Sequence, residues 1–461
     1  MRSTRTRIGA ALMVALAMGL VAACGDDDDG GGGDAASTND EEVTISVSNL
    51  PPETEPETRE AFLTRVEEFE AANPNITVDA QEWEWDVTTF GSQLAGNTLP
   101  TTFEIPFTYG PTLIERGQLQ DITAEFDELP YADEFNPDVL QAVEEDDKIY
   151  AVPTAAYAMG LHYNRAMFEA AGLDPDEPPT SWDEVREYAK AISDATGQAG
   201  YIQMTQDSTG GWALTSVVNA MGGRVEDGSG DDVTATLDDP AVREALEMLQ
   251  AMRWEDDSMG DNFLFDWGGV NQAFAAGQAG MYISGSDVYN SLVTENSVDP
   301  ASYGLTTVPL DGDDAGVLGG GTIVGVRPDS SAAERSAAVK WIDFFYLSKL
   351  TDEDAAIADA EALVASDGPL GTPTLPLFNA EQLAESDAWV ADLVNVPLDQ
   401  MMPFKDNILD QPLVAEPPVA AQEVYAELDT VVQAILTDQN ADIDALLEPA
   451  NENVSSLVES G

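Results

Sequence analysis

Four of the eight tryptophans lie where their side chains could form a binding surface. Trp83 and Trp85 alternate in the loop sequence QEWEWD, whereas Trp212 and Trp267 each lie beside a pair of glycines. A large aromatic ring beside glycine on a loop is rarely needed for a core, and its flat apolar face suits the C–H face of a sugar. We therefore predict that these four tryptophans contact a ligand. The alternation of Trp83 and Trp85 also fits a strand with one packed face, and that alternative stays open.

The sequence offers little for catalysis. Carboxylate pairs can hydrolyse glycosides, but among 86 acidic residues no pair stands out. His162, the one histidine, lies within the strand pattern LHYN, which favours packing over catalysis. The motifs G-x-S-x-G, H-E-x-x-H, C-x-x-C and the Walker loop do not occur in the sequence. We therefore expect a protein that is not an enzyme, with no cofactor and no metal site.

A strand and a helix are predicted after Tyr150. A short apolar run ends at Pro153 and leads into a strand-like segment at 159–163. Asn164 then begins a helical segment, and Gly172 ends it, because asparagine caps helix N-termini and glycine tolerates the left-handed conformation after a helix.

A second helix is predicted to begin at Ser181. Ser181 and Glu184 form an S-x-x-E capping box, in which the serine hydroxyl accepts a free N–H and the glutamate reaches back to the cap. Apolar residues then recur at helical spacing as far as Ile192, and Gly197 offers a stop.

The N-terminal part of the sequence predicts a parallel sheet. Residues 43–48 alternate between apolar and polar side chains, as a strand does, and residues 60–72 place apolar side chains on one helical face. Asn73-Pro74 stops that helix before a second strand at 76–78. The order strand, helix, strand is typical of an α/β fold.

Several segments resemble the family 1 extracellular solute-binding proteins of ABC importers, the group that includes the maltose-binding proteins. The resemblance covers nearly the whole chain after its N-terminal segment, and the matching segments occur in the family's order. They are YAVP, LHYNRAMFEAAGLDP and PTSWDEVREYAKAI within 150–193, FEAANPNITV at 69–78, RGQLQDIT at 116–123, AFAAGQAGMYISGS at 273–286, GGGTIVGV at 319–326 and AAVKWIDFF at 337–345.

The resemblance implies an α/β, two-lobed periplasmic-binding-protein-like fold. Each lobe would be a mostly parallel sheet flanked by helices, with a hinge and a cleft between the lobes. Carried onto this chain, the crossings between lobes fall near Val152, Ala301 and Leu350. The N-lobe would then comprise 43–152 and 301–349, and the C-lobe 153–300 and 350–461.

The resemblance also implies where a ligand would bind. Tyr157 occupies the family's ligand position on the hinge strand, and Tyr109 occupies a loop position of the first lobe. Ser286 and Asp287 follow a strand whose end lines the cleft. The remaining predicted ligand-binding residues are Asn49, which follows the first strand, Glu104, and the glycines Gly320 and Gly321, which allow a close backbone approach.

Three positions depart from the family pattern. A Pro-Asp pair before the third strand is here Pro100-Thr101, and Glu104 lies near a position where maltose binders carry an aromatic residue. Asp287 replaces another aromatic residue. These departures argue against a maltose-like specificity.

By this resemblance, the chain would bind a sugar or oligosaccharide in the cleft, close by hinge rotation and deliver the solute to ABC permease subunits. An alternative is the same fold binding a polyol, a glycerol-phosphate derivative or a compatible solute. A phosphate would need basic residues, and Arg224 and Arg253 are the obvious candidates. A surface adhesin or scaffold is a third possibility. We expect a monomer.

The N-terminus predicts export and a lipid anchor. Three arginines precede an apolar stretch at 8–23, and VAAC places Cys24, the one cysteine, in a lipobox. Sixteen apolar residues are too few for a membrane span, which needs about 20. We predict a signal peptide at 1–23, lipidation of Cys24, a Gly/Asp-rich tether at 24–42 and a location on the outer face of the cell membrane. The aspartates lack EF-hand spacing, so a calcium loop is disfavoured.

The acidity of the chain is extreme. The chain carries 86 acidic and 18 basic residues and a formal net charge of −68, which excludes nucleic acid as a ligand because phosphate contacts need a basic face. Such a charge destabilises a compact state by self-repulsion unless salt screens it. We infer adaptation to a saline exterior.

Overall fold

The computed structural model describes residues 42–86 and 89–460. The predicted signal peptide, Cys24 and all but the last residue of the predicted tether lie outside the described residues. In the part of the chain that is described, no helix is both long enough and apolar enough to cross a membrane.

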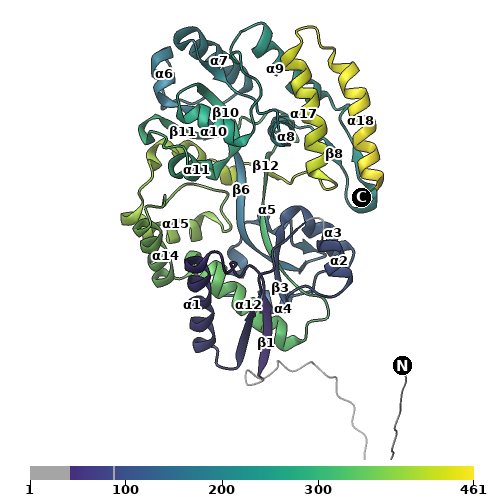
Figure 1. Cartoon of the computed structure of the whole chain (residues 1–461), viewed down its shortest axis with the longest axis vertical. Helices are drawn as coiled ribbons and strands as arrows, with labels where there is room; N and C mark the ends of the chain where they lie inside the picture. The colour runs from purple at the N-terminus through teal and green to yellow at the C-terminus, as the bar shows by residue number, and fades with distance from the viewer. Residues whose placement is uncertain (1–41, 87–88, 461) are drawn as a thin grey trace, which may run out of the picture. The chain divides into compact units, whose positions relative to one another are not determined.

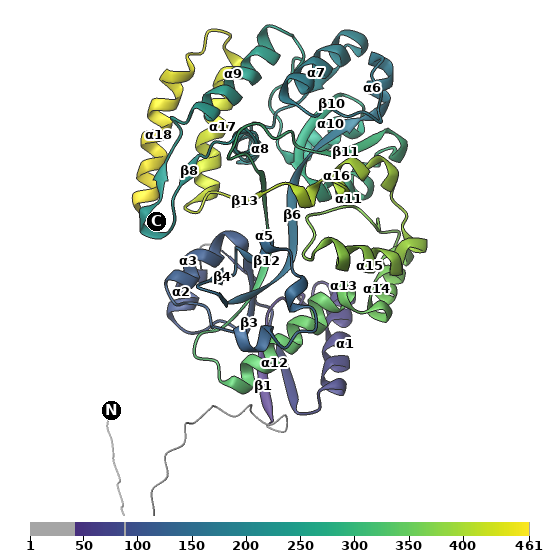
Figure 2. The same cartoon turned by 180° about the vertical axis from the view of Figure 1, so that it is seen from behind.

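The fold is built around two long strands, β6 (Ala151–Asn164) and β12 (Val317–Val326). The first half of β6 pairs antiparallel with β12, and its second half pairs antiparallel with β10 (Ala279–Gly285) and β11 (Tyr303–Thr307). The main sheet therefore runs without interruption in the order β2-β1-β3-β12-β6-β10-β7. Figures 1 and 2 show β6 and β12 running between two groups of helices.

Strand β6 is longer than the strand-like segment that the sequence predicted at 159–163. The apolar run at Pro153 and the segment at 159–163 belong to one strand of 14 residues. Proline has no N–H to give to a neighbouring strand, so it needs an irregular position in a sheet. The register between β6 and β12 shifts next to Pro153, and Thr154 Oγ1 donates to the Thr322 carbonyl oxygen at 3.3 Å.

The N-terminal strands form the predicted parallel unit. Strand β1 (Val43–Val47) pairs in parallel with β2 (Ile76–Ala80) and β3 (Thr102–Pro106), and β3 pairs antiparallel with β12. Helix α1 (Pro56–Ala72) begins one turn earlier than predicted. Its Phe69 meets the indole of Trp341 edge-on at 5.3 Å. Trp341 lies on α12 (Ala332–Ile342), which ends in a π-helical turn at Asp343–Leu347.

Helices α6 (Arg165–Ala171) and α7 (Trp182–Thr196) lie near the C-terminal end of β6. Asn164 caps α6 by accepting the Met167 N–H at 3.1 Å, and Gly172 adopts the left-handed conformation after it, as predicted. Ser181 caps α7 by accepting the Glu184 N–H at 3.2 Å. The full capping box is not formed, because the Glu184 carboxylate accepts the N–H and hydroxyl of the preceding residue, Thr180.

The remaining elements complete both groups of helices. The C-terminal region contains irregular chain at 366–379 and across much of 394–420. The other helices are α2 (Phe90–Ala95), α3 (Gly110–Glu115), α4 (Thr123–Phe126), α5 (Pro137–Leu140), α8 (Thr209–Ala220), α9 (Pro240–Trp254), α10 (Trp267–Ala275), α11 (Tyr289–Thr294), α13 (Ser348–Thr351), α14 (Glu353–Ala365), α15 (Ala380–Val390), α16 (Met402–Lys405), α17 (Ala421–Thr437) and α18 (Ile443–Ser460), and the other strands are β4 (Glu144–Glu145), β5 (Lys148–Ile149), β7 (Ala199–Tyr201), β8 (Glu226–Asp227), β9 (Thr234–Ala235) and β13 (Leu413–Val414).

Strand β8 contains a buried carboxyl group without a cation partner in the described chain. Glu226 is 5% exposed, and one of its oxygens accepts the Val419 N–H at 3.0 Å. The other oxygen has no hydrogen-bond partner among the described residues. Burial raises the pKa of the Glu226 carboxyl to about 7. The ionised form is therefore disfavoured in the folded protein.

The Glu226→Gln substitution should stabilise the protein at high pH only. An unfolded glutamate ionises near pH 4.3, so the native carboxyl destabilises the fold progressively as the pH rises from there through 7. We expect the variant to gain about 2 kcal/mol of unfolding free energy at pH 8 and almost none at pH 4.5. Urea unfolding at both pH values measures this difference, with Glu385→Gln on exposed α15 as the control. A gain that does not change with pH would contradict the assignment.

Candidate functional site

The predicted ligand-binding residues fall into two groups in the structure, and the first lies around β1 and β3. Asn49 follows β1 with a positive φ of 66°, and its N–H donates to the Trp83 carbonyl oxygen at 2.8 Å. The Glu104 carboxyl on β3 is hydrogen-bonded to the side chains of Tyr346 and Asn49. Burial raises the pKa of Glu104, and these hydrogen bonds oppose that rise. Asn49 and Glu104 are thus brought together.

The aromatic residues of this first group pack partly against the core. The Trp83 indole N–H donates to Gln93 Oε1 at 2.8 Å, and its ring lies 6.2 Å from that of Phe103. The Trp85 and Tyr109 rings meet edge-on at 5.1 Å. Both tryptophans are half-buried, so packing accounts for part of each ring and leaves part of it accessible. The buried Trp85 indole nitrogen has no partner among the described residues.

The second group converges on Gly285, the last residue of β10. A Cβ at Gly285 would lie 2.8 Å from an oxygen of Asp287, 3.8 Å from the Tyr157 ring and 4.0 Å from the Trp212 ring. The rings of Tyr157 and Trp212 are themselves 6.3 Å apart. We call Tyr157, Trp212 and Asp287 the Gly285 cluster. A Cβ at Gly285 would make ordinary contacts with both rings, and only the Asp287 carboxylate would have to turn away from it.

A hydrogen-bond chain joins the Gly285 cluster to the C-terminal region. The Trp212 indole hydrogen-bonds to the Tyr157 phenol, and the phenol hydrogen-bonds to the Glu416 carboxyl. The Tyr425 hydroxyl donates to the same carboxyl at 3.4 Å. Burial raises the pKa of Glu416, and the bonds from the two tyrosines oppose that rise. Burial likewise raises the pKa of Tyr157 well above its usual range, so the phenol stays protonated and can donate.

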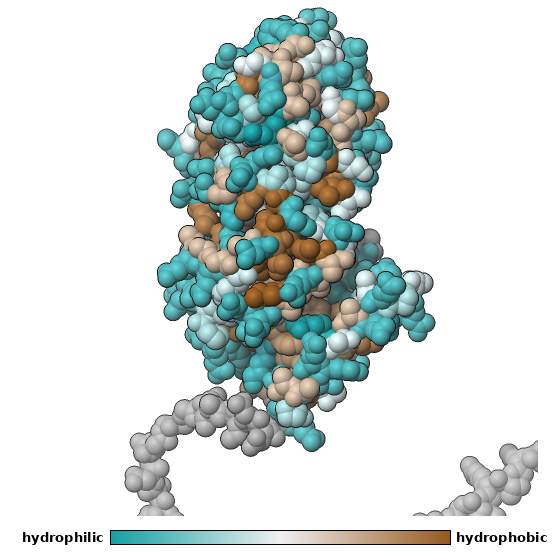
Figure 3. All heavy atoms as spheres, turned by 90° about the vertical axis from the view of Figure 1, so that its left-hand side faces the viewer, coloured by the Kyte–Doolittle hydropathy of each residue, from teal (hydrophilic) through white to brown (hydrophobic). Residues whose placement is uncertain are grey.

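A cavity of about 560 Å³ lies beside β6 and β12. Its walls come from 154–157 on β6, from Gly321 and Thr322 on β12, from Asp287 and Asn290, and from 374–378 with neighbouring apolar residues of α13 and α15. Tyr157, Asp287 and Gly321 of the predicted set line it. Figure 3 shows hydrophobic residues gathered midway along the face that carries α14 and α15 in Figure 1. A volume of this size suits a small organic ligand.

The paired glycines of β12 hold aromatic rings close to the backbone. A Cβ at Gly320 would lie 3.1 Å from Cε1 of Tyr157, and one at Gly321 would lie 2.8 Å from the ring of Phe107. The two rings therefore lie against neighbouring residues of one strand. Gly320 and Gly321 set the position of Tyr157 and of the short helical turn at Phe107–Tyr109, which the sequence alone did not indicate.

Trp267 and Ser286 lie near the same end of β10. The Trp267 indole N–H donates to Ser284 Oγ at 3.2 Å, which fixes its ring at the start of α10. The Ser286 hydroxyl is fully buried and has no hydrogen-bond partner among the described residues. Burial raises the pKa of the neighbouring Asp287, although its side chain keeps access to solvent.

Residues from the C-terminal region were missed by sequence reasoning. Glu416 and Tyr425 complete the hydrogen-bond chain, and the charge of Glu423 on α17 raises the pKa of Tyr109 in the first group, second to burial. No local pattern marks these residues, because their partners lie hundreds of positions earlier in the chain. Tyr346, which hydrogen-bonds to Glu104, lies in the π-helical turn at Asp343–Leu347 and was not predicted as a site residue.

The side chains of the single histidine and of the two candidate arginines form hydrogen bonds within the protein rather than contributing to the Gly285 cluster. His162 is fully buried between the Tyr303 hydroxyl at 2.8 Å and the Ser284 carbonyl oxygen at 3.2 Å, and burial lowers its pKa to about 4. Arg224 donates to the backbone carbonyl oxygens of Gly223 and Asp314. Arg253 donates to two further backbone carbonyl oxygens and lies 4.9 Å from the Trp254 ring.

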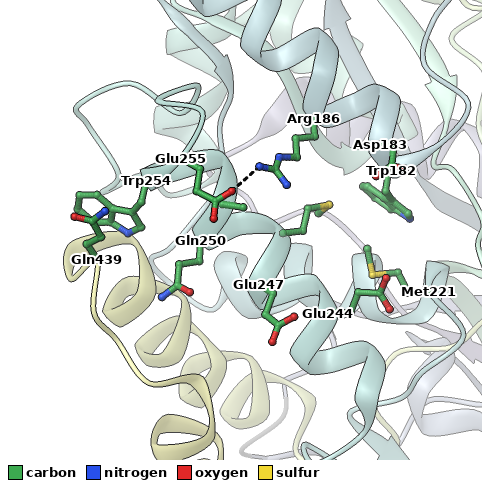
Figure 4. A pocket seen from close by; sticks show the side chains of 12 residues that line it. Trp182, Asp183, Arg186, Met221, Glu244, Glu247, Gln250, Trp254, Glu255 and Gln439 are labelled. Carbon is green, nitrogen blue, oxygen red and sulfur yellow. Dashed lines mark hydrogen bonds and ion pairs between the residues drawn. The ribbon is translucent and has the colours of Figure 1, made fainter.

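A second cavity, of about 570 Å³, lies between α7 and α9 and contains none of the predicted ligand-binding residues (Figure 4). Trp182 lines it but is only 6% exposed, and the Trp254 indole donates to the Ile435 carbonyl oxygen. Arg186 lies on one wall and forms an ion pair with Glu255 at 3.0 Å. This cavity belongs to the packing of the helices rather than to the Gly285 cluster.

Solved structures share this fold. The sugar-binding protein MalE of Xanthomonas citri covers 91% of this chain with 98% of its own, at 18% identity and a TM-score of 0.66. The cyclic alpha-maltosyl-1,6-maltose binding protein of Arthrobacter globiformis covers 91% with 100% of its own, at 21% identity and a TM-score of 0.65. The predicted two-lobed periplasmic-binding-protein-like α/β fold is thereby confirmed.

Sequence relatives agree with the fold. An uncharacterised ABC transporter extracellular-binding protein of Pyrococcus horikoshii is 26% identical over 272 residues, which are 56% of this chain and 59% of the relative. The match thus spans about three fifths of that relative's length. A family model for bacterial extracellular solute-binding proteins matches residues 64–361, more than half of the 461 residues. The chain therefore belongs to the bacterial extracellular solute-binding protein family.

Proposed function

We propose that the chain is the substrate-binding lipoprotein of an ABC importer. It would bind a sugar or oligosaccharide beside strands β6 and β12 and deliver it to the permease. The convergence of Tyr157, Trp212 and Asp287 on Gly285 carries this proposal. Aromatic rings can lie against the C–H face of a sugar while a carboxylate accepts its hydroxyl hydrogens. The cavity beside Tyr157 and Asp287 has room for such a ligand.

The strand pairing supports a closing motion. Strands β6 and β12 join the two groups of helices, so bending of these strands would bring Trp85 and Tyr109 toward the Gly285 cluster. The lobe boundaries remain part of this proposal. The pairing of β11 with the second half of β6, which also pairs with β10, supports moving the second crossing from Ala301 to the segment between β11 and β12.

The proposed lipid anchor rests on the VAAC sequence at Cys24 and on the predicted tether. Membership in an extracellular family supports a location outside the cytoplasm. The anchor would hold the protein on the outer face of the membrane, near the permease that receives its ligand. Electrospray mass spectrometry of the protein extracted from membranes would detect cleavage before Cys24 and the added acyl chains.

A non-sugar solute is the second candidate. The glycerol-3-phosphate-binding periplasmic protein UgpB of Escherichia coli is 25% identical over 197 residues, which cover 40% of this chain. The UgpB structure of Mycobacterium tuberculosis with glycerophosphocholine covers 91% of the chain at a TM-score of 0.65. Arg224 and Arg253 give little support to a phosphate ligand, because backbone carbonyl oxygens already occupy their guanidinium groups.

The Trp212→Ala substitution should weaken sugar binding at least tenfold, since it removes one face of the Gly285 cluster and the donor to Tyr157. Titration of the wild-type protein with mono- and oligosaccharides and polyols, followed by tryptophan fluorescence, first identifies a ligand. Calorimetry then compares the affinity of Trp212→Ala with that of Trp254→Ala, a control in the second cavity. Equal affinities in two folded variants would place the ligand elsewhere. The absence of any saturable response would contradict sugar binding.

Adaptation to high salt remains a proposal that the net charge of −68 supports. At about 1 M salt the Debye length is only about 3 Å, so repulsion among surface carboxylates is largely screened. We expect the free energy of unfolding to rise by more than about 2 kcal/mol between dilute buffer and multimolar NaCl. Urea unfolding followed by circular dichroism measures it. Equal stability at both salt concentrations would refute the adaptation.

A further inference from the structure

The proposed binding site holds negative charge that no cation of the described chain neutralises. Asp287 lines the cavity, and Glu416 bonds to Tyr157 of the Gly285 cluster. Both charges act on the same phenol, because Asp287 and Glu416 each raise the pKa of Tyr157. Neither carboxylate forms an ion pair with any described lysine or arginine, and no basic residue is among the described residues that line the cavity.

The acidity of the chain as a whole does not explain these two carboxylates. Surface carboxylates keep their hydration and add solubility at little cost. Burial raises the pKa of Asp287 and of Glu416, so each loses part of its hydration in the folded protein, although the Asp287 side chain keeps access to solvent. An incompletely hydrated carboxylate without a counter-charge is unfavourable unless something else compensates it. Glu416 is partly compensated by hydrogen bonds to Tyr157 and Tyr425, whereas Asp287 accepts only from its own backbone.

The surroundings of Asp287 suit a positive charge. One carboxylate oxygen of Asp287, Cδ2 of Tyr157 and Cη2 of Trp212 all lie within 4.0 Å of one point, the Cβ position of Gly285. An aromatic ring attracts a cation to its face, most strongly when water is excluded, and tryptophan is the best ring for this. A carboxylate next to two such rings therefore has the composition of a site for an ammonium group. The alkyl or ring carbons attached to that nitrogen would pack against the same aromatic surfaces.

We propose that the ligand of this site carries a positively charged nitrogen, which Asp287 neutralises while Tyr157 and Trp212 pack around it. The inference rests on the proposed function, since it specifies the class of solute that the Gly285 cluster selects. Glu416 acts through Tyr157: its carboxylate holds the phenol in place and adds a second negative charge behind it. An amino sugar and a trimethylammonium compound both present this chemistry.

Matched ligand pairs that differ only in charge test the proposal. Calorimetric titrations of the full mature chain in one high-salt buffer near pH 6 compare glucosamine with glucose, galactosamine with galactose, and choline with its neutral isostere 3,3-dimethylbutan-1-ol. We expect the charged member of at least one pair to bind at least about tenfold more tightly than its neutral partner. A charge-assisted hydrogen bond from an ammonium group, or a desolvated cation–π contact of a trimethylammonium group, contributes about this much. The sugar pairs and the choline pair separate the two sources of the ammonium group.

The Asp287→Asn substitution tests the residue assignment. Asp287 is exposed and has no partner beyond its own turn, so the variant should fold. It should reduce the affinity for the charged ligand at least about tenfold and change that for the neutral partner less than about twofold. Asp359→Asn on α14, which removes an exposed charge far along the chain from the cluster, should leave both affinities unchanged.

The outcomes separate this inference from the proposed function. If sugars bind but no charged ligand binds more tightly than its neutral partner in any pair, the cationic ligand is overturned and sugar binding is supported. An Asp287→Asn variant that keeps its preference for the charged ligand would also overturn the cationic ligand. A folded protein that binds no member of any pair would overturn the inference, whereas the sugar-binding proposal is decided by the fluorescence titration with oligosaccharides and polyols.

Discussion

The backbone hydrogen bonding of β6 is the constraint on which the rest of the structure depends. A single strand of 14 residues pairs with β12 along its first half and with β10 and β11 along its second. Both groups of helices therefore pack on one continuous sheet. The Gly285 cluster is assembled at this junction, because Tyr157 lies on β6 opposite Gly320 of β12, and Asp287 follows the end of β10. The backbone hydrogen bonds that hold β6 and β12 together therefore also position Tyr157 in the candidate site.

Charge and aromaticity are distributed unequally around this junction. The aromatic residues near β1 and β3 are partly engaged in packing, through the contacts of Trp83 with Phe103 and of Trp85 with Tyr109. The residues around Gly285 instead form a polar chain of indole, phenol and carboxyl groups that ends at Glu416. Beside this chain, the buried Ser286 hydroxyl has no hydrogen-bond partner among the described residues, so a ligand that bonds to it would stabilise the bound state. The specificity of the site is therefore expected to reside mainly on the side of β10.

Much of the fold could be predicted from the sequence, because its signals are local. The cap at Asn164, the stop at Gly172 and the strand-helix-strand order at 43–78 depend on neighbouring residues and were found as predicted. The continuity of β6 was not predicted, since Pro153 and the alanine-rich residues after it carry no strand signal and become a strand only by pairing with β12. Of the site, Tyr157, Trp212 and Asp287 were predicted individually. Their convergence on Gly285 and the contribution of Glu416 depend on pairings between distant segments, which no spacing in the sequence reveals.

Because Asp287 makes few contacts, its position can tolerate substitution during evolution. Its side chain is accessible, makes no bond to a distant element and lies outside the β6–β12 pairing. Substitutions there alter the chemistry offered to a solute without weakening the scaffold, whereas a change at Gly320 would disturb the packing of the Tyr157 ring. Stability and specificity are thus assigned to different neighbouring positions. If Asp287 binds the solute as proposed, a single substitution there can change which solute is bound without compensating mutations elsewhere in the scaffold.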